Sequence, residues 1–281
     1  MPGTLYVVAT PIGNLEDVTL RALRVLREVA VVAAEDTRRT AHLLQHYSIS
    51  TRTTSLHAHN EHRRVPGLIA RLVGGESVAL VSDAGTPLVS DPGRLLVTAA
   101  HKAGVRVEPI PGPSAVMAAI SAAGLVETEF VFAGFPPHRS KARIEWLTGL
   151  ASQPRAVVFY EAPHRIRATM AESRRIFSNR SVFWARELTK AHEESAVRPI
   201  LEVDPAAMSE IGEYTVVIGP SGAVPGVGAD VTAAEIMASI GDVTKTGGLS
   251  RRAAAREVAA RLGLPPNDVY RAMLEAKKSP K

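Results

Sequence analysis

The chain has 281 residues, of which 46% are hydrophobic and 22% charged, so it is long enough for two compact folded domains and is not an intrinsically disordered protein. Its formal net charge is +5, and its lack of cysteine excludes disulfides and thiolate metal sites. No apolar run approaches the roughly 20 residues of a membrane helix, and residues 1–13 lack the pattern of a secretion signal, so we expect a cytoplasmic protein without a membrane part.

The first part of the chain alternates short apolar runs with amphipathic patterns. The expected strands are Thr4–Ala9, Ala30–Ala34, Ser77–Ser82 and Val105–Ile110. The expected helices are Leu20–Val29, Thr37–Tyr47, Asn60–Val73, Asp91–Ala103 and Ser114–Ala123. Strands that alternate with helices predict an α/β domain with a largely parallel sheet, which we assign to residues 1–117.

A second α/β domain is expected over residues 118–220. Its strand candidates are apolar runs, namely Phe130–Phe135, Ala156–Tyr160, Val182–Ala185 and Tyr214–Ile218. Residues 221–230 are rich in proline, glycine and serine, which predicts a linker.

The tail, residues 231–281, is expected to be helical. Ser250 can cap a helix that runs to Leu262. Residues 251–281 hold eight basic and three acidic side chains, which account for the whole net charge. This asymmetry favours contact with a polyanion such as RNA. The alternative is a small helical bundle packed on the core through side chains such as Val258, and both interpretations stay open.

Four turns at strand ends combine glycine or proline with polar side chains. They are Ala9–Asn14, Val81–Gly93, Pro109–Ser114 and Phe159–Arg165. The first lacks both glycine patterns of dinucleotide and P-loop sites, which argues against those classes. The second can hold a small polar ligand through its backbone, and the third precedes a helix whose N-terminus suits an anionic group. Together the turns predict a ligand cleft between two domains.

Charged residues follow the second expected strand directly. They are Glu35, Asp36, Arg38 and Arg39. At the carboxyl edge of a parallel sheet such residues are well placed for a substrate. The alternative is a helix start with a capping acid. A further basic group after Pro136 and Pro137 is either a solvated helix face or an RNA contact; it consists of Arg139, Lys141 and Arg143.

At these motifs the chain resembles a known family. The strings are TPIGNLEDVTLRAL, AAEDTRRT, SDAGTPLVSDPG, PIPGPSAV, FYEAPHR and ARELTKAHEE. They are similar to those of the ribosomal RNA small-subunit methyltransferase I family, a branch of the tetrapyrrole methylases. The resemblance spans about residues 4–219. It implies S-adenosylmethionine-dependent 2′-O-methylation of a cytidine in 16S ribosomal RNA of the small subunit, an interdomain cofactor cleft and a homodimer.

On this resemblance we expect the cofactor to be bound by the turns and their flanking strands. The expected residues are Pro11, Ile12, Asp83, Ala84, Gly85, Thr86, Val89, Ser114, Ala115, Tyr160, Leu188 and Thr215. For the substrate we expect Glu35, Asp36, Arg38, Arg39 and Arg165. Glu161 and Lys190 are candidate bases for the ribose hydroxyl, although catalysis by positioning alone remains open.

The sequence also argues against two other functions and against a metal site. Tetrapyrrole-modifying relatives usually carry Gly-Asp-Pro where this chain has Gly13-Asn14-Leu15, which argues against a small-molecule tetrapyrrole methylase. The intact cofactor turns argue against a non-catalytic RNA-binding protein. Where RNA-branch relatives commonly carry a glutamate, this chain has Ala58, so no essential role is expected there. The neighbouring histidines fit no standard metal spacing, and we expect no metal.

Overall fold

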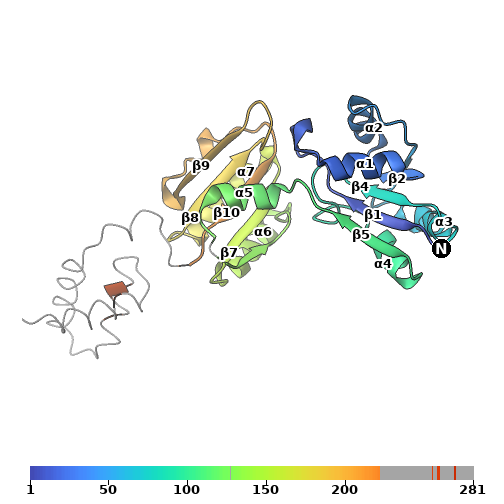
Figure 1. Cartoon of the computed structure of the whole chain (residues 1–281). Coiled ribbons are helices and arrows are strands. Elements are labelled where there is room, and N and C mark those ends of the chain that lie inside the picture. The colour runs from blue at the N-terminus through green and yellow to red at the C-terminus, as the bar shows by residue number, and fades with distance from the viewer. Residues whose placement is uncertain (127, 222–254, 256–257, 260–268, 270–281) are drawn as a thin grey trace, which may run out of the picture. The chain divides into compact units, whose positions relative to one another are not determined.

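The computed structural model describes residues 1–126, 128–221, 255, 258–259 and 269 (Figure 1). The described chain divides into two compact units. The first is Met1–Ala118 together with Glu187–Glu194, and the second is Ala119–Arg186 together with the described residues from Ser195 on. The first division lies one residue beyond the expected boundary. The segment Glu187–Glu194, expected in the second domain, instead clusters with the first unit.

Most of the expected linker and tail lie outside the described residues. This holds for residues 222–230 and for the helix expected between Ser250 and Leu262, apart from single positions. Among those positions, Val258 is buried. The two interpretations of the tail therefore both remain predictions.

The first unit is built on a five-stranded parallel sheet. Its strands are β1 (Thr4–Val8), β2 (Val31–Ala34), β3 (Thr53–Ser55), β4 (Val78–Val81) and β5 (Arg106–Ile110). The order across the sheet is β3-β2-β4-β1-β5, and all four pairings are parallel. This confirms the expected α/β class.

Helices cover both faces of this sheet. They are α1 (Leu20–Glu28), α2 (Thr37–His46), α3 (Glu61–Val73) and α4 (Arg94–Lys102), with a 3₁₀ turn, η1, at Leu15–Asp17. Residues of α1 and α2 form one core with Val32 and Ala34 of β2. Residues of α3 and α4 form the other with Val31 and Ala33. Because both faces are buried, the strands are continuous apolar runs rather than alternating ones.

The second unit holds a mixed sheet. Its strands are β6 (Phe130–Phe132), β7 (Ala156–Glu161), β8 (Ser181–Arg186), β9 (Glu194–Pro199) and β10 (Tyr214–Ile218). The order is β6-β7-β10-β8-β9, with β6 parallel to β7 and β10 antiparallel to both β7 and β8. The helix α5 (Ala115–Ala123) crosses the division between the units.

Two helices and two short turns pack on this second sheet. They are α6 (Ser140–Ala151), α7 (Pro163–Ile176), η2 (Ile200–Glu202) and η3 (Pro205–Ala207). Leu147 of α6 and Met170 of α7 share a core with Phe159 of β7 and Val216 of β10. Within the described part of the chain, no helix combines the length and apolar character that crossing a membrane requires.

Candidate functional site

The carboxyl ends of the first sheet form a topological switch point. The strands β1 and β2 are followed by α1 and α2, which pack on one face, whereas β4 is followed by α4 on the opposite face. Since β4 lies between β1 and β2 in the sheet, its loop diverges from those of both neighbours. Ligands of open α/β sheets bind at such a point. The topology therefore selects the loops after β1, β2 and β4.

The loops after β1 and β4 are joined by a backbone bridge. Thr10 and Gly85 exchange two N–H···O=C bonds of 2.9 Å each, and the hydroxyl of Thr10 donates to the carbonyl of Ser82 at 3.3 Å. The hydroxyl of Thr86 donates to the carbonyl of Pro113 in the loop after β5, at 3.0 Å. Three of the four turns singled out in the sequence are thus bonded to one another within the first unit.

The loop after β4 has a strained backbone. Leu88 and Ser90 adopt φ of 71° and 69°, and Gly85 and Gly93 adopt 78° and 120°. Non-glycine residues in this left-handed region cost on the order of 1–3 kcal/mol each and persist where the surroundings fix them, commonly beside ligands. The strain also explains why α4 starts at Arg94 and not at the expected Asp91, because residues at positive φ cannot continue a right-handed helix.

Three carboxylates gather after β2 and β4, from Glu35, Asp83 and Asp91. Asp83 Oδ1 accepts the N–H of Asp36 at 2.9 Å, and Glu35 accepts the N–H of Asp83 at 3.4 Å. Burial, followed by the charge of Asp83, raises the pKa of Glu35. Burial also raises the pKa of Asp91 to about 6, against a hydrogen bond from Ser82 that lowers it. A cation at this edge would relieve the repulsion.

Arg38 and Arg39 lie in the first turn of α2 beside these carboxylates. Arg38 donates to both carboxylate oxygens of Asp36, at 3.0 and 2.7 Å, and this hydrogen bonding lowers the pKa of Asp36 to about 2. Asp36 also caps α2 by accepting the N–H of Arg38. Arg39 Nε lies 3.7 Å from Asp83 Oδ2. The capping alternative is therefore confirmed for Asp36. The side chains of Arg38 and Arg39 are largely exposed, and their role in binding a substrate stays a prediction.

The segment Glu187–Glu194 packs on the loop after β1. The N–H of Asn14 donates to Thr189 Oγ1 at 3.0 Å, across 175 positions of sequence. A Cβ added at Gly13 would lie 2.9 Å from the carbonyl oxygen of Leu188 and 2.5 Å from Lys190 Cγ. Glycine is therefore required at position 13 by close packing. Lys190 Nζ donates to Glu187 Oε1 at 2.8 Å, which places this candidate base in an ion pair.

Two cofactor candidates lie side by side in the second unit. Tyr160 of β7 and Thr215 of β10 are register partners on neighbouring antiparallel strands. All the other cofactor candidates belong to the first unit, including Leu188. Nine of these candidates lie in the three linked loops after β1, β4 and β5 or at the start of α5. They are Pro11, Ile12, Asp83, Ala84, Gly85, Thr86, Val89, Ser114 and Ala115. Their role in cofactor binding stays a prediction.

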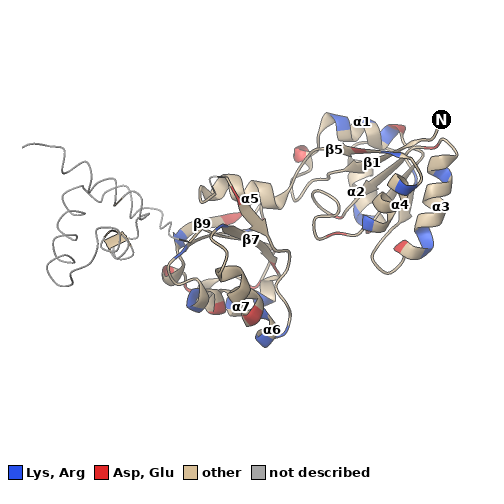
Figure 2. Ribbon diagram, turned by 90° about the horizontal axis from the view of Figure 1, so that it is seen from below, with Lys and Arg blue, Asp and Glu red and all other residues tan. Residues whose placement is uncertain are grey.

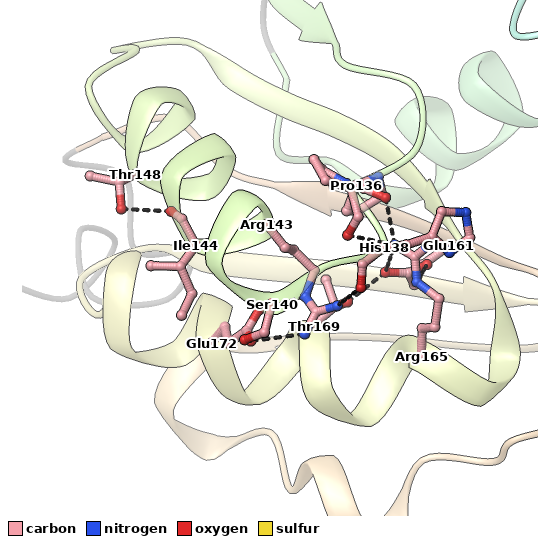
Figure 3. A network of polar contacts seen from close by, with 11 residues as sticks. Pro136, His138, Ser140, Arg143, Ile144, Thr148, Glu161, Arg165, Thr169 and Glu172 are labelled. Atoms are coloured by element: carbon pink, nitrogen blue, oxygen red, sulfur yellow. Dashed lines mark hydrogen bonds and ion pairs between the residues drawn. The ribbon is translucent and has the colours of Figure 1, made fainter.

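Glu161 and Arg165 occupy a buried polar network of the second unit (Figure 3). The Glu161 carboxylate accepts hydrogen bonds from Thr169 Oγ1 at 2.5 Å and from Arg165 at 3.3 Å, and its side chain has no exposed surface. Arg165 also donates to the carbonyls of Pro136 and Pro137, at 2.5 and 3.3 Å. These contacts argue against the expected roles of Glu161 as a base and of Arg165 as an RNA contact, because both groups are enclosed and paired.

The same network includes a buried bidentate ion pair. Arg143 of α6 donates to the two oxygens of Glu172 of α7 at 2.6 and 2.8 Å, and Ser140 donates to Glu172 at 2.8 Å. Burial alone raises the pKa of Glu172, but the hydrogen bonds from Arg143 and Ser140 outweigh burial and lower it. Arg143, expected on a solvated or RNA-binding face, is thus internal to the unit.

The histidine-rich segment before α3 has a structural role that the sequence did not reveal. Glu61 Oε1 accepts the N–H groups of Gly93 at 2.9 Å and Leu95 at 3.3 Å, so it satisfies the start of α4 from another helix. Asn60 accepts the N–H of His57 at 2.9 Å. In residues 1–126 and 128–221, no group of three or more His, Asp or Glu side chains is placed to hold a metal ion.

Comparison with known proteins gives this geometry a family. The family model of the tetrapyrrole (corrin/porphyrin) methylases matches residues 4–204. Proteins described as ribosomal RNA small subunit methyltransferase I are similar over much or all of the chain. The one from Synechocystis sp. is 42% identical over 97% of this chain and 98% of its own length. The one from Vibrio cholerae is 50% identical over 71% of this chain and 69% of its own.

Solved structures share the fold at low sequence identity. The methyltransferase CobJ superposes with a TM-score of 0.60 at 20% identity, over 78% of this chain and 95% of its own. A uroporphyrin-III C-methyl transferase from Thermus thermophilus, complexed with S-adenyl homocysteine, gives 0.55 at 20% identity, over 77% and 97%. The family match, the near full-length relatives and the shared fold agree with the loops described above. The chain belongs to the ribosomal RNA small subunit methyltransferase I family of the tetrapyrrole methylases.

Proposed function

We propose that this chain transfers the methyl group of S-adenosylmethionine to the ribose 2′-oxygen of a cytidine in 16S ribosomal RNA. The methyltransferase activity on small-subunit ribosomal RNA, with S-adenosylmethionine as methyl donor, follows from the family. One observation carries this assignment, namely 42% identity over 97% of the chain to a relative named for that activity. The 2′-oxygen and the cytidine are the finer part of the proposal, as are the assembled small subunit as substrate, a homodimer and a cytoplasmic location.

The residues of the first unit fit such a cofactor. Gly85 allows a close approach to the backbone because it has no side chain, and its φ of 78° suits glycine. The carboxylates Glu35, Asp83 and Asp91 favour a cation, which the sulfonium and ammonium groups of the cofactor supply. The N-terminus of α5 favours its carboxylate. When bound, the cofactor supplies an activated methyl group.

The protein's own contribution to the reaction is orientation of the reacting groups. The three bonded loops hold their backbone groups in fixed positions, which lowers the entropic cost of bringing donor and hydroxyl into line. The ribose hydroxyl must lose its proton as the new bond forms. Since Glu161 is enclosed in the second unit, Lys190 with its partner Glu187 is the candidate that lies beside the first loop.

A small-molecule tetrapyrrole methylase is the competing assignment. The solved structures of tetrapyrrole-modifying relatives are 18–22% identical to this chain, whereas the relatives named for ribosomal RNA are 42–54% identical. The first loop also differs from that of tetrapyrrole-modifying relatives, which usually carry an aspartate where this chain has Asn14. The N–H of Asn14 donates to Thr189 Oγ1. The RNA substrate is therefore favoured.

The decisive experiment maps ribose methylation on small-subunit RNA from cells with and without this chain, by mass spectrometry of nuclease fragments. We expect one cytidine 2′-O-methyl group to disappear with the chain and to return when the purified protein and S-adenosylmethionine are added to subunits. A methyl group lost from a base would refute the ribose assignment. An unchanged methylation pattern would refute the function.

A further inference from the structure

One exposed aromatic ring of the second unit has no role in the site described so far. Phe135 follows β6 and leaves 54% of its surface exposed. Its ring lies 5.3 Å from that of Tyr160, which in turn packs edge-on against Phe132 at 5.1 Å. Single exposed apolar residues are common and need no explanation. Phe135 differs from them because it extends a small aromatic cluster beside Tyr160.

Hydrogen bonds on both sides of Phe135 in the sequence hold its backbone in place. Gly134 adopts φ of 69°, and its carbonyl accepts the N–H of Tyr160 at 2.9 Å. On the other side, the carbonyls of Pro136 and Pro137 accept hydrogen bonds from the buried guanidinium of Arg165 (Figure 3). Two prolines in succession restrict the chain further. The ring is therefore held out on a rigid turn, with little conformational entropy left to lose on binding.

Positive charge lies directly after this ring. Arg139 and Lys141 are exposed at the start of α6, where Figure 2 shows Lys and Arg positions in blue. Among the described residues their side chains have no hydrogen-bond or ion-pair partner, in contrast to Arg143 two positions on, which is buried against Glu172. An exposed ring followed closely in the sequence by unpaired cations is a combination by which proteins bind single-stranded RNA, through base stacking and phosphate contact.

We propose that Phe135 is a stacking platform for an unpaired base of the RNA substrate, with Arg139 and Lys141 binding the adjoining phosphates. The inference rests on the proposed function, which supplies RNA as the substrate. It adds where on the second unit the RNA binds and by which chemistry. The hydrogen bonds from Arg165 to the carbonyls of Pro136 and Pro137 hold the turn that carries Phe135.

The test measures binding of a single-stranded RNA of about ten nucleotides, a length typical of one binding module, that carries 2-aminopurine at one position. Stacking on Phe135 should quench the 2-aminopurine fluorescence. Phe135→Ala should weaken binding about 10- to 100-fold, the usual effect of removing one stacking ring, and should abolish the quenching. Phe135→Trp should retain both. Ile211→Ala is the matched control, because Ile211 of the same unit is 76% exposed and should bind RNA as the wild type does.

Two further measurements separate the explanations. The double variant Arg139→Ala, Lys141→Ala should bind RNA with a weaker salt dependence. The slope of log affinity against log salt concentration should become less negative by about 1.4, the contribution of two phosphate contacts on a single strand. Calorimetry with S-adenosylmethionine should give the same affinity for Phe135→Ala and the wild type. Equal RNA affinity of Phe135→Ala and Ile211→Ala would overturn the inference. So would a loss of cofactor affinity in Phe135→Ala, because the ring would then stack on the cofactor's adenine. If the wild type itself fails to methylate small-subunit RNA, the proposed function fails, whatever Phe135 does.

Discussion

Replacing Asp91 by asparagine should stabilise the protein at neutral pH. The wild-type carboxyl lies in the strained loop after β4, and burial together with Glu35 and Asp83 raises its pKa from 3.8 to about 6. The folded protein therefore binds the proton of Asp91 more tightly than the unfolded chain does. The cost of the charged form is fully present above pH 6 and is relieved as the pH falls through 6 towards 3.8. Asparagine has no charge and avoids that cost.

The size of the effect follows from the two pKa values. A change from 3.8 to about 6 corresponds to about 3 kcal/mol of differential stability. Because Asp91 is only partly buried, solvent screening reduces this figure, and we expect ~1.5 kcal/mol. For a chain of this size that corresponds to a rise in Tm of about 3–6 °C. Asparagine keeps a carbonyl that can accept the hydrogen bond of Ser82, so little is lost on substitution.

The assay is thermal unfolding of both proteins between pH 4 and 8. The stability difference in favour of Asp91→Asn should be largest above pH 7 and shrink steadily towards pH 4, because the carboxyl of the folded wild type gains its proton over this interval while that of the unfolded chain stays largely ionised until the pH nears 3.8. Asp17→Asn, a matched change at an exposed aspartate of the first unit, should show no such trend. A difference that stays constant with pH, or that favours the wild type at pH 8, would refute the reasoning.

The remaining predictions concern other parts of the two units. Glu172→Gln should lower the free energy of unfolding by about 3–5 kcal/mol, because it leaves Arg143 buried without its charged partner. Since folding lowers the pKa of Glu172, the stability advantage of the wild type is present above pH 4.5 and is lost in more acidic solution. Urea titrations at several pH values will show this dependence. Gly13→Ala should displace the Glu187–Glu194 segment, whose backbone would lie 2.9 Å from the new Cβ, and speed proteolysis within that segment while lowering methyl transfer; an unchanged cleavage rate would contradict the packing. Gly85→Val places a β-branched residue at φ 78°, with its Cβ 3.3 Å from Ile12, so calorimetry should find no cofactor binding by a protein that stays soluble. Cofactor affinity of the wild type should fall between pH 7 and pH 5, as Asp91 gains its proton and the carboxylate cluster loses charge; an affinity that rises over this interval would exclude the cluster as the cation site.

The first unit was largely predictable because its strands are buried on both faces. β2 and β4 consist of four buried apolar residues each, and such runs can be recognised without partners. β3 escaped prediction because its residues, Thr53–Ser55, are polar and its only described neighbour in the sheet is β2. Propensity decides little at such an edge, where pairing with β2 forms the strand.

The second unit was predicted less completely, for a reason visible in its helices. Arg143 of α6 and Arg165 of α7 occupy buried positions, so charged residues interrupt the apolar periodicity by which an amphipathic helix is recognised. Their partners, Glu172 and Glu161, come from other elements of the unit. Glu172 lies 29 positions from Arg143, so no local pattern contains this partner. Glu161 is only four positions from Arg165, but the carbonyls of Pro136 and Pro137 that complete the burial of Arg165 are distant in sequence.

The turns of the candidate site could be predicted, but their connections could not. Glycine and proline mark the loops, as only certain residues fit such backbone conformations. The bridge from Thr10 to Gly85 and the capping of α4 by Glu61 join residues more than 30 positions apart. The raised pKa of Asp91 has in part the same origin, since one of its causes is the charge of Glu35, which follows a different strand.

The return of Glu187–Glu194 to the first unit has a consequence for synthesis of the chain. A ribosome that has released residues 1–118 has delivered all strands of the first sheet, but not the segment that packs on Gly13 and bonds Asn14. The first unit can reach its final form only after the strands β6, β7 and β8 of the second have also emerged. Contacts this distant in sequence form late because closing so long a loop costs entropy. A fragment ending at Ala118 would therefore lack part of its own unit, and neither unit can be excised from the gene as one continuous piece.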